Sequence, residues 1–166
     1  MIASLSEREI PTNANVGLCF LDDLASRMRE SKLCTQNITN ANLNDQELKD
    51  LAAELVKIAE EFQEQLCPIY RHLNLLLYQK TVKRVDTGGI ASLMGDIDAV
   101  MQKLTSMTFD LGEFYQKHQF SQDLQKNASG AAYFRKGHKM WIGYYVHFIL
   151  SNLESIPRFY RLLTQT

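Results

Sequence analysis

Apolar residues recur every three or four positions in two long stretches of the chain. The first stretch runs from Leu48 to Leu66 and the second from Ile90 to Leu104. This spacing places the apolar side chains on one face of an α-helix. Alternating apolar and polar runs bounded by Asn-Gly or Asp-Gly turns, which are typical of β-hairpins, are nearly absent. The pattern therefore predicts an all-α protein.

In the first half of the chain, we expect the helical bundle to begin with one shorter helix. Residues 16–30 carry an apolar stripe, which predicts a helix, and the polar, aperiodic residues 31–44 predict a loop. Asn44 and Glu47 have the spacing of a capping box, in which each side chain bonds the backbone of the other. We therefore expect the next helix to begin directly after Asn44.

Pro68 interrupts the pattern that follows. Proline removes one helical hydrogen bond and biases the preceding Cys67 toward extended backbone. Helical spacing nevertheless resumes at Ile69. The sequence predicts either one long helix with a kink near Pro68 or two helices that meet near Cys67.

The clearest break in the second half is Asp86-Thr87-Gly88-Gly89, because two successive glycines favour a turn. Beyond it we expect helices over residues 89–107 and 136–153, with a short helix starting at Thr108 or Asp110 and a loop that includes a turn of helix over 121–130. A terminal helix should follow, with Ser155 as its cap and Pro157 just inside. The prediction is a single-domain helical bundle of five to seven helices over residues 15–166, preceded by a weakly structured arm over residues 1–14.

Composition narrows the class of protein. The chain has 166 residues, 45% of them hydrophobic, and a net charge of −1. Such a length fits one domain with a substantial core, and the near-neutral charge argues against a protein built mainly to bind nucleic acid. Residues 45–64 contain seven acids, whereas residues 71–85 contain four bases and no acid. These segments are either solvated helix faces of opposite sign, which could pack together, or charged docking faces.

No reactive or metal-binding set stands out in the sequence. None of the four histidines has the carboxylate or second histidine that a helical metal site needs at its spacing. His147 interrupts an apolar helix, so we expect it to be neutral and at least half-buried. The three cysteines form no Cys-x-x-Cys pair; Cys19 is expected in the core, and Cys67 has no neighbours that would supply an oxyanion hole. We predict no enzyme activity, no metal and no cofactor.

The strongest candidate contact is the basic and aromatic segment at residues 133–141. It holds three cations beside aromatic rings, a composition that could bind phosphates, anionic lipid headgroups or a nucleic-acid backbone. The alternative is a solvated loop and helix start whose tryptophan anchors the core. The candidate contact residues, including two bases from the chain's end, are Arg135, Lys136, Lys139, Trp141, Arg158 and Arg161.

The function that these observations favour is recognition of another protein. We expect an intracellular (cytoplasmic or nuclear) adaptor or complex subunit that binds a partner, or itself, through a helix face or groove. A candidate acidic docking face comprises Glu54, Glu60, Glu61 and Glu64. The alternative is binding of an anionic ligand through residues 135–139. The longest apolar stretch, residues 140–150, is about half of the roughly 20 residues that a membrane span requires.

Overall fold

The computed structural model describes the backbone of residues 12–124 and 128–165, and the side chains of residues 13–111, 137 and 139–164. Within these residues the chain forms helices and no strand, which confirms the all-α prediction. The helices are α1 (Thr12–Glu30), α2 (Lys32–Thr35), α3 (Asp45–Val82), α4 (Gly88–Leu124) and α5 (Ala128–Gln165).

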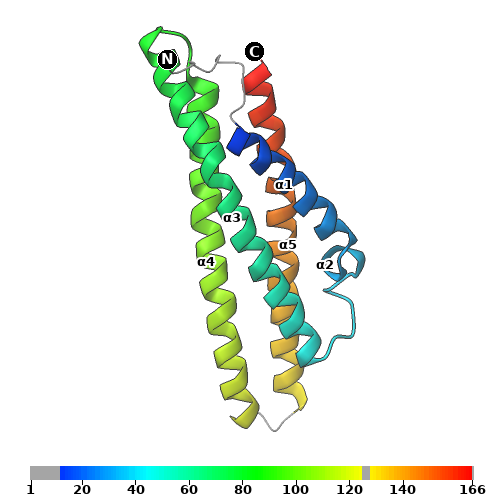
Figure 1. Ribbon diagram of the computed structural model, residues 1–166. Coiled ribbons are helices and arrows are strands. Elements are labelled where there is room, and N and C mark those ends of the chain that lie inside the picture. Colours follow the sequence, from blue (N-terminus) through cyan, green and yellow to red (C-terminus); the bar gives the residue numbers. More distant parts are fainter. Residues whose placement is uncertain (1–11, 125–127, 166) are drawn as a thin grey trace.

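Three long helices, α3, α4 and α5, run side by side with alternating direction, and α1 lies along one side of them (Figure 1). α1 packs on α3 and α5 and makes no contact with α4 in the described part of the chain. α5 therefore has two different flanks, one beside α1 and one beside α4. A single core lies between the four helices. Its largest fully buried side chains include Leu18, Leu21, Met28, Phe62, Leu66, Ile69 and Tyr160.

The start of α3 follows the predicted capping box. The Asn44 side chain accepts a hydrogen bond from the Glu47 N–H at 2.8 Å, and the Glu47 carboxylate accepts one from the Asn44 N–H at 3.2 Å. These bonds satisfy backbone groups that have no partner within the helix. The helix boundary at Asn44 is therefore confirmed.

Pro68 lies inside one continuous helix, so the alternative of two helices meeting near Cys67 is wrong. Leu66 and Ile69, on either side of the proline, are fully buried. Burying such side chains stabilises by about 1.5–3 kcal/mol each, which offsets the roughly 3 kcal/mol that an internal proline costs a helix. Packing on both sides of Pro68 thus keeps α3 helical.

α4 and α5 are also longer than expected. No helix begins at Thr108 or Asp110; the Thr108 hydroxyl instead donates to the Leu104 carbonyl of its own helix at 2.9 Å. The expected loop over 121–130 is helical at 121–124 and at 128–130, and residues 125–127 lie outside the described part. α5 runs from Ala128 through Pro157 without a break, so the expected separate terminal helix is wrong.

The shorter elements differ from the prediction by small amounts. α1 begins at Thr12, four residues before the expected start at Val16. Residues 1–11 of the expected arm lie outside the described part of the chain. The expected loop over residues 31–44 contains the single turn α2, which begins where the Ser31 hydroxyl accepts a hydrogen bond from the Leu33 N–H.

The turn between α3 and α4 lies where the two glycines predict it. The Asp86 carboxylate accepts a hydrogen bond from the Gly88 N–H at 2.9 Å, in the first turn of α4. An aspartate in this position is a helix-initiating residue, so the role of Asp86 is structural.

Candidate functional site

The seam between α4 and α5 is hollowed along much of its length. Two adjoining hollows, of about 270 and about 260 Å³, share Leu93, Asp96 and Phe159 in their walls. Together they are lined by residues 89–103 of α4 and 148–163 of α5. We call this feature the α4–α5 groove. It lies on the flank of α5 that α1 does not cover.

The groove has a buried floor and an exposed apolar rim. Leu93 and Ile156 lie in the floor and are almost fully buried. At the rim, Phe159 keeps 45% of its surface exposed and Leu162 keeps 55%. Tyr144, which lies one turn before the groove residue Phe148, is also exposed. The spacings between Tyr144, Phe148, Phe159 and Leu162 are 4, 11 and 3 positions. These spacings place the four side chains on the same side of α5.

Two charged side chains stand on the α4 wall of the groove. The Lys103 ammonium lies 4.6 Å from the centre of the Tyr144 ring and 4.8 Å from that of Phe148, and it donates a hydrogen bond to the Tyr144 hydroxyl. Rings at this distance attract a cation and hold it in place. Asp96 is exposed and has no ion pair with any residue that the structure describes. The two charges are seven residues apart, about 10 Å along the helix axis.

Among the described candidate bases, the structure separates Lys139 from Arg158 and Arg161. The Lys139 ammonium donates to the Ala41 carbonyl at 2.5 Å, and the Arg161 guanidinium forms an ion pair with Asp22 of α1 at 2.6 Å. Arg158 stacks on the Phe159 ring at 5.0 Å. Since Arg158 follows Lys139 by 19 positions, the two are about 28 Å apart along α5.

The rest of that segment is described only in part. The side chains of Arg135 and Lys136 lie outside the described residues. Trp141 is partly exposed and lies edge-on to Tyr145, with ring centres 5.9 Å apart. The alternative prediction, in which Trp141 anchors the core, therefore fits the structure only in part.

The four acids of the predicted docking face have different environments. Glu61 lies 3.7 Å from Arg27 of α1, as an ion pair across the α1–α3 contact. Glu60 and Glu64 are exposed. Glu54 lines a small hollow beside α2, together with Asp50 and Lys32. Glu61 and Glu54 thus lie beside neighbouring elements, whereas Glu60 and Glu64 face solvent, and the acidic docking face stays a prediction.

Two predictions about buried reactive groups are wrong. Cys19 is exposed, because Leu18 and Leu21 take the core-facing positions of α1. His147 is also exposed, because Val146 and Ile149 occupy the buried positions around it. Cys19 and His147 therefore lie on the exposed faces of their helices although their neighbours in the sequence are apolar.

Sequence reasoning did not single out the buried pair of His72 and Tyr160. The His72 Nδ1 atom and the Tyr160 hydroxyl are hydrogen-bonded, and their rings meet edge to face with centres 5.6 Å apart. Burial lowers the pKa of His72 and raises the pKa of Tyr160, so both are neutral near pH 7. The sequence does contain a pattern that indicates burial of His72, because this residue occupies the same helical face as Ile69, Leu73 and Leu76.

The described side chains contain no group of three or more histidines, cysteines or acids that could hold a metal ion. Among the described helices, none combines the length and the apolar character needed to cross a membrane. Comparisons with protein-family models, curated proteins and solved structures found no match for this chain. The geometry of the chain's own surfaces therefore carries the functional argument.

Proposed function

We propose that this protein is a non-enzymatic interaction module that binds an amphipathic helix of a partner protein in the α4–α5 groove. The observation that carries this proposal is the pair of exposed apolar side chains at the groove's rim, Phe159 and Leu162. Single exposed apolar residues are normal on protein surfaces. Two of them together at the rim of a groove favour a binding site.

The shape of the groove favours a helix as its occupant. From Phe148 to Leu162 the α5 wall spans about 21 Å, which is the length of roughly 14 helical residues. A helix that lies along this wall would present apolar residues at spacings of three and four toward the rim. The groove thus suits a partner helix of about four turns.

The charges of the groove narrow the chemistry of that helix. A base on the partner would lie opposite Asp96, and an acid would lie opposite Lys103. Because these residues are seven apart on α4, the partner's two charges would also be about seven residues apart on one face. Opposite charges at such an interface set the direction and register of binding.

Binding of an anionic ligand through residues 135–139 has less support. Lys139 is hydrogen-bonded to the Ala41 carbonyl, and Arg161 is paired with Asp22. Each would have to give up an internal contact before it could bind a phosphate. The exposed side chains of Phe159 and Leu162 at the groove's rim are accessible without such a change.

A selection from displayed helical peptides of random sequence tests the proposal. The whole chain is immobilised, and bound peptides are recovered and sequenced. We expect them to be amphipathic, with apolar residues at helical spacing and with a base and an acid about seven positions apart. The double variant Phe159→Ala/Leu162→Ala should weaken their binding at least about tenfold, as is typical of central apolar contacts.

The matched control is Phe109→Ala, which removes an exposed aromatic side chain of α4 that does not line the groove. It should leave peptide binding unchanged. Recovered peptides without helical spacing, or an equal loss in the control, would contradict the proposal. Light scattering that shows a stable dimer disrupted by the double variant would instead assign the groove to a second copy of the chain.

A further inference from the structure

The last turns of α3 and the loop after them carry a second exposed apolar surface. Leu75, Tyr78 and Val82 are 43%, 70% and 66% exposed, and their spacing places them on one face of the helix. Val85, in the loop, is exposed as well. We call residues 71–85 the α3 tip. None of these residues lines the α4–α5 groove.

The α3 tip is also basic. It contains Arg71, Lys80, Lys83 and Arg84, and no acid. Arg71 and Arg84 are exposed and form no ion pair with a residue that the structure describes. Elsewhere in the described part, arginines such as Arg29 and Arg161 pair with carboxylates. The tip therefore combines exposed apolar side chains with two arginines that form no ion pair with a described residue.

Arg84 occupies a position that favours glycine. Its φ angle of 57° lies in the left-handed region. The Val85 N–H donates to the Lys80 carbonyl at 2.9 Å, and the Arg84 N–H donates to the Thr81 carbonyl at 3.1 Å, which is the Schellman pattern that ends helices. A glycine would adopt this conformation with less strain. The chain thus places a cation here against the local backbone preference.

The helix dipole explains only part of this arrangement. Bases near the carboxyl end of a helix are favoured by its partial negative charge. That effect gives no reason for Leu75, Tyr78 and Val82 to stay in contact with water. A site that needs both bases and apolar side chains accounts for the two together.

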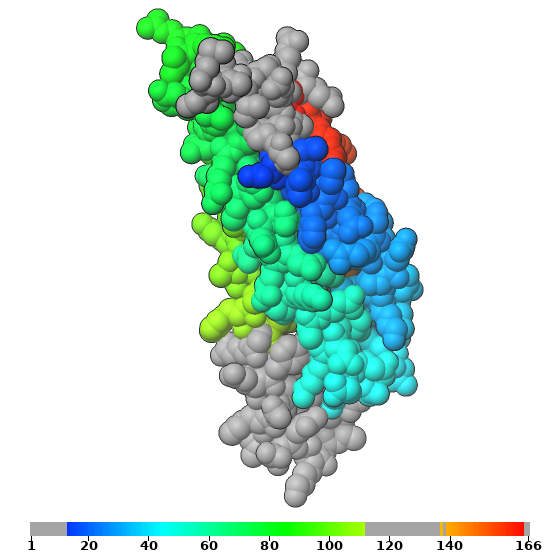
Figure 2. All heavy atoms as spheres, in the orientation of Figure 1, coloured from blue at the N-terminus to red at the C-terminus, as the bar shows by residue number. Residues whose placement is uncertain are grey.

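We propose that the α3 tip binds the surface of an anionic lipid bilayer. Figure 2 shows the end of α3 and the following loop projecting at the upper left of the molecule. A projecting surface of this kind can reach a flat bilayer, whereas a rigid partner would have to be hollowed to fit it. Bases are attracted to anionic headgroups, while exposed aliphatic and aromatic side chains enter the interface.

Vesicle co-sedimentation of the whole chain tests this binding. The probes are vesicles of phosphatidylcholine alone and vesicles that also contain phosphatidylserine. We expect binding only to the anionic vesicles, with an affinity that falls as salt is added. Arg71→Gln/Arg84→Gln should weaken it by roughly fivefold per charge removed. Tyr78→Ser should also weaken it, because it removes an apolar contact.

The matched controls remove the same charge and the same kind of side chain elsewhere. Lys32→Gln/Lys57→Gln changes the net charge equally, and Phe109→Ser removes a side chain whose exposure, 68%, is close to that of Tyr78. Both controls should bind anionic vesicles like the unaltered chain. Equal losses in tip and control variants, or no binding to anionic vesicles, would overturn the proposal. Preference for polyglutamate over vesicles would overturn it in favour of an acidic polypeptide partner.

Arg84→Gly separates binding from folding. Because glycine suits the left-handed position, this variant should raise the denaturation midpoint while it weakens vesicle binding by roughly fivefold. A variant that folds better and binds less cannot be explained by unfolding. A more stable variant with unchanged vesicle binding would contradict a role for Arg84 at the membrane.

Discussion

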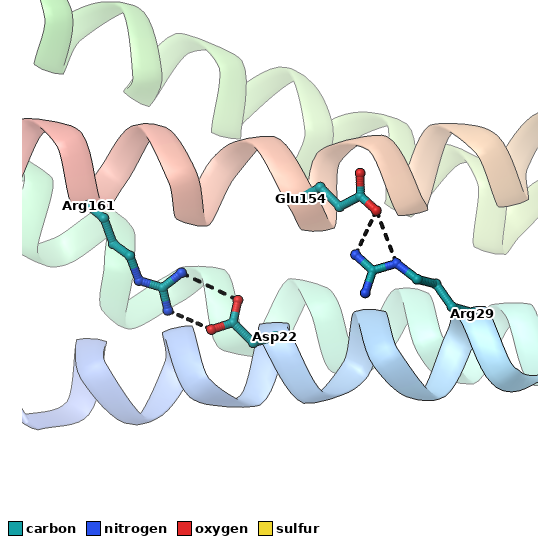
Figure 3. Close-up of polar contacts among 4 residues, drawn as sticks. All are labelled: Asp22, Arg29, Glu154 and Arg161. Atoms are coloured by element: carbon teal, nitrogen blue, oxygen red, sulfur yellow. Dashed lines mark hydrogen bonds and ion pairs between the residues drawn. The ribbon is translucent and has the colours of Figure 1, made fainter.

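The two flanks of α5 have opposite environments. Beside α1, the seam is crossed by two ion pairs, Arg161–Asp22 and Arg29–Glu154, each with a contact of 2.6 Å (Figure 3). Beside α4, the seam is a groove with an exposed apolar rim. One helix thus has a closed flank and an open flank.

The difference is clearest at two neighbouring residues. Tyr160 is completely buried, whereas Phe159, one position earlier, is 45% exposed. Both are aromatic and both belong to the same turn of α5. Tyr160 faces His72 of α3 inside the core, whereas Phe159 faces the groove beside α4, so the exposure of Phe159 reflects its position at the groove's rim. This difference is the reason to expect that a partner helix takes the place along α4 and α5 that α1 takes on the other flank.

The largest expected effect compares a buried side chain of α1 with a groove side chain. Leu21→Ala should lower the free energy of unfolding by about 2–5 kcal/mol, because Leu21 is fully buried and the change leaves a cavity. Phe159→Ala should cost less than about 1 kcal/mol, since the ring is half in water. Denaturant titrations of both variants measure this. A similar loss in the two would mean that the groove is part of the core.

A smaller effect is expected from the buried tyrosine. Tyr160→Phe removes the hydroxyl that is bonded to His72 and leaves the ring nitrogen without a partner in the core. Leaving a buried polar group unsatisfied costs about 1–3 kcal/mol. The same titrations compare this variant with Phe159→Ala. A neutral Tyr160→Phe would show that water reaches His72, which would contradict a closed core there.

Stability should also depend on pH through His72. Burial lowers the pKa of His72 below its usual 6.5, so the unfolded chain binds a proton more readily than the folded one. This contribution to stability is therefore complete above pH 6.5 and is lost as the pH falls below it. The slope of the unfolding free energy is at most about 1.4 kcal/mol per pH unit for one proton.

The comparison for this prediction is His72→Gln, which has no charge to gain. Denaturant titrations between about pH 5 and pH 7 should show a smaller pH dependence in the variant than in the unaltered chain. Carboxylates titrate similarly in both proteins, so the difference isolates the histidine. Equal slopes would be evidence against a neutral, buried His72.

The smallest expected effect on stability comes from the ion pairs between α1 and α5. Arg161 and Asp22 are both more than one third exposed, so water screens their attraction. A double-mutant cycle with Arg161→Gln and Asp22→Asn should give a coupling of about 0–1 kcal/mol, weakened by added salt. A much larger coupling would mean that charge pairing holds α1 in place more than leucine packing does.

Local sequence rules predicted the starts of α3 and α4 closely. The Asn44 and Glu47 side chains form their capping box, and the Asp86 carboxylate accepts a hydrogen bond from Gly88 at the start of α4, and these bonds join residues two or three positions apart. The same rules left two alternatives open at Pro68 and wrongly predicted a separate terminal helix at Pro157, and in both places long-range burial outweighs a lost hydrogen bond. Helix ends that are set by local hydrogen bonds were therefore predictable. Whether a helix continues through a proline depended on the helices packed against it.

The candidate site was much less predictable. Apolar spacing assigns Phe159 and Leu162 to an amphipathic helix, but it does not say that α1 packs on one flank of α5 while a groove lies between α5 and α4 on the other. The run of bases at residues 71–85 was visible in the sequence, yet the exposure of Tyr78 and Val82 beside it was not. Both surfaces depend on where helices end relative to one another, which only the fold determines.

Site-specific photo-crosslinking in cells tests the central claim most directly. A photoreactive phenylalanine analogue replaces Leu162 in the groove or, as a control, Phe109 outside it, and mass spectrometry locates the linked peptide. We predict that the groove position links to an amphipathic helical segment of one partner, with a base and an acid about seven residues apart, and that Phe159→Ala abolishes the link. Crosslinks that are the same from both positions, or that survive Phe159→Ala, would contradict the account.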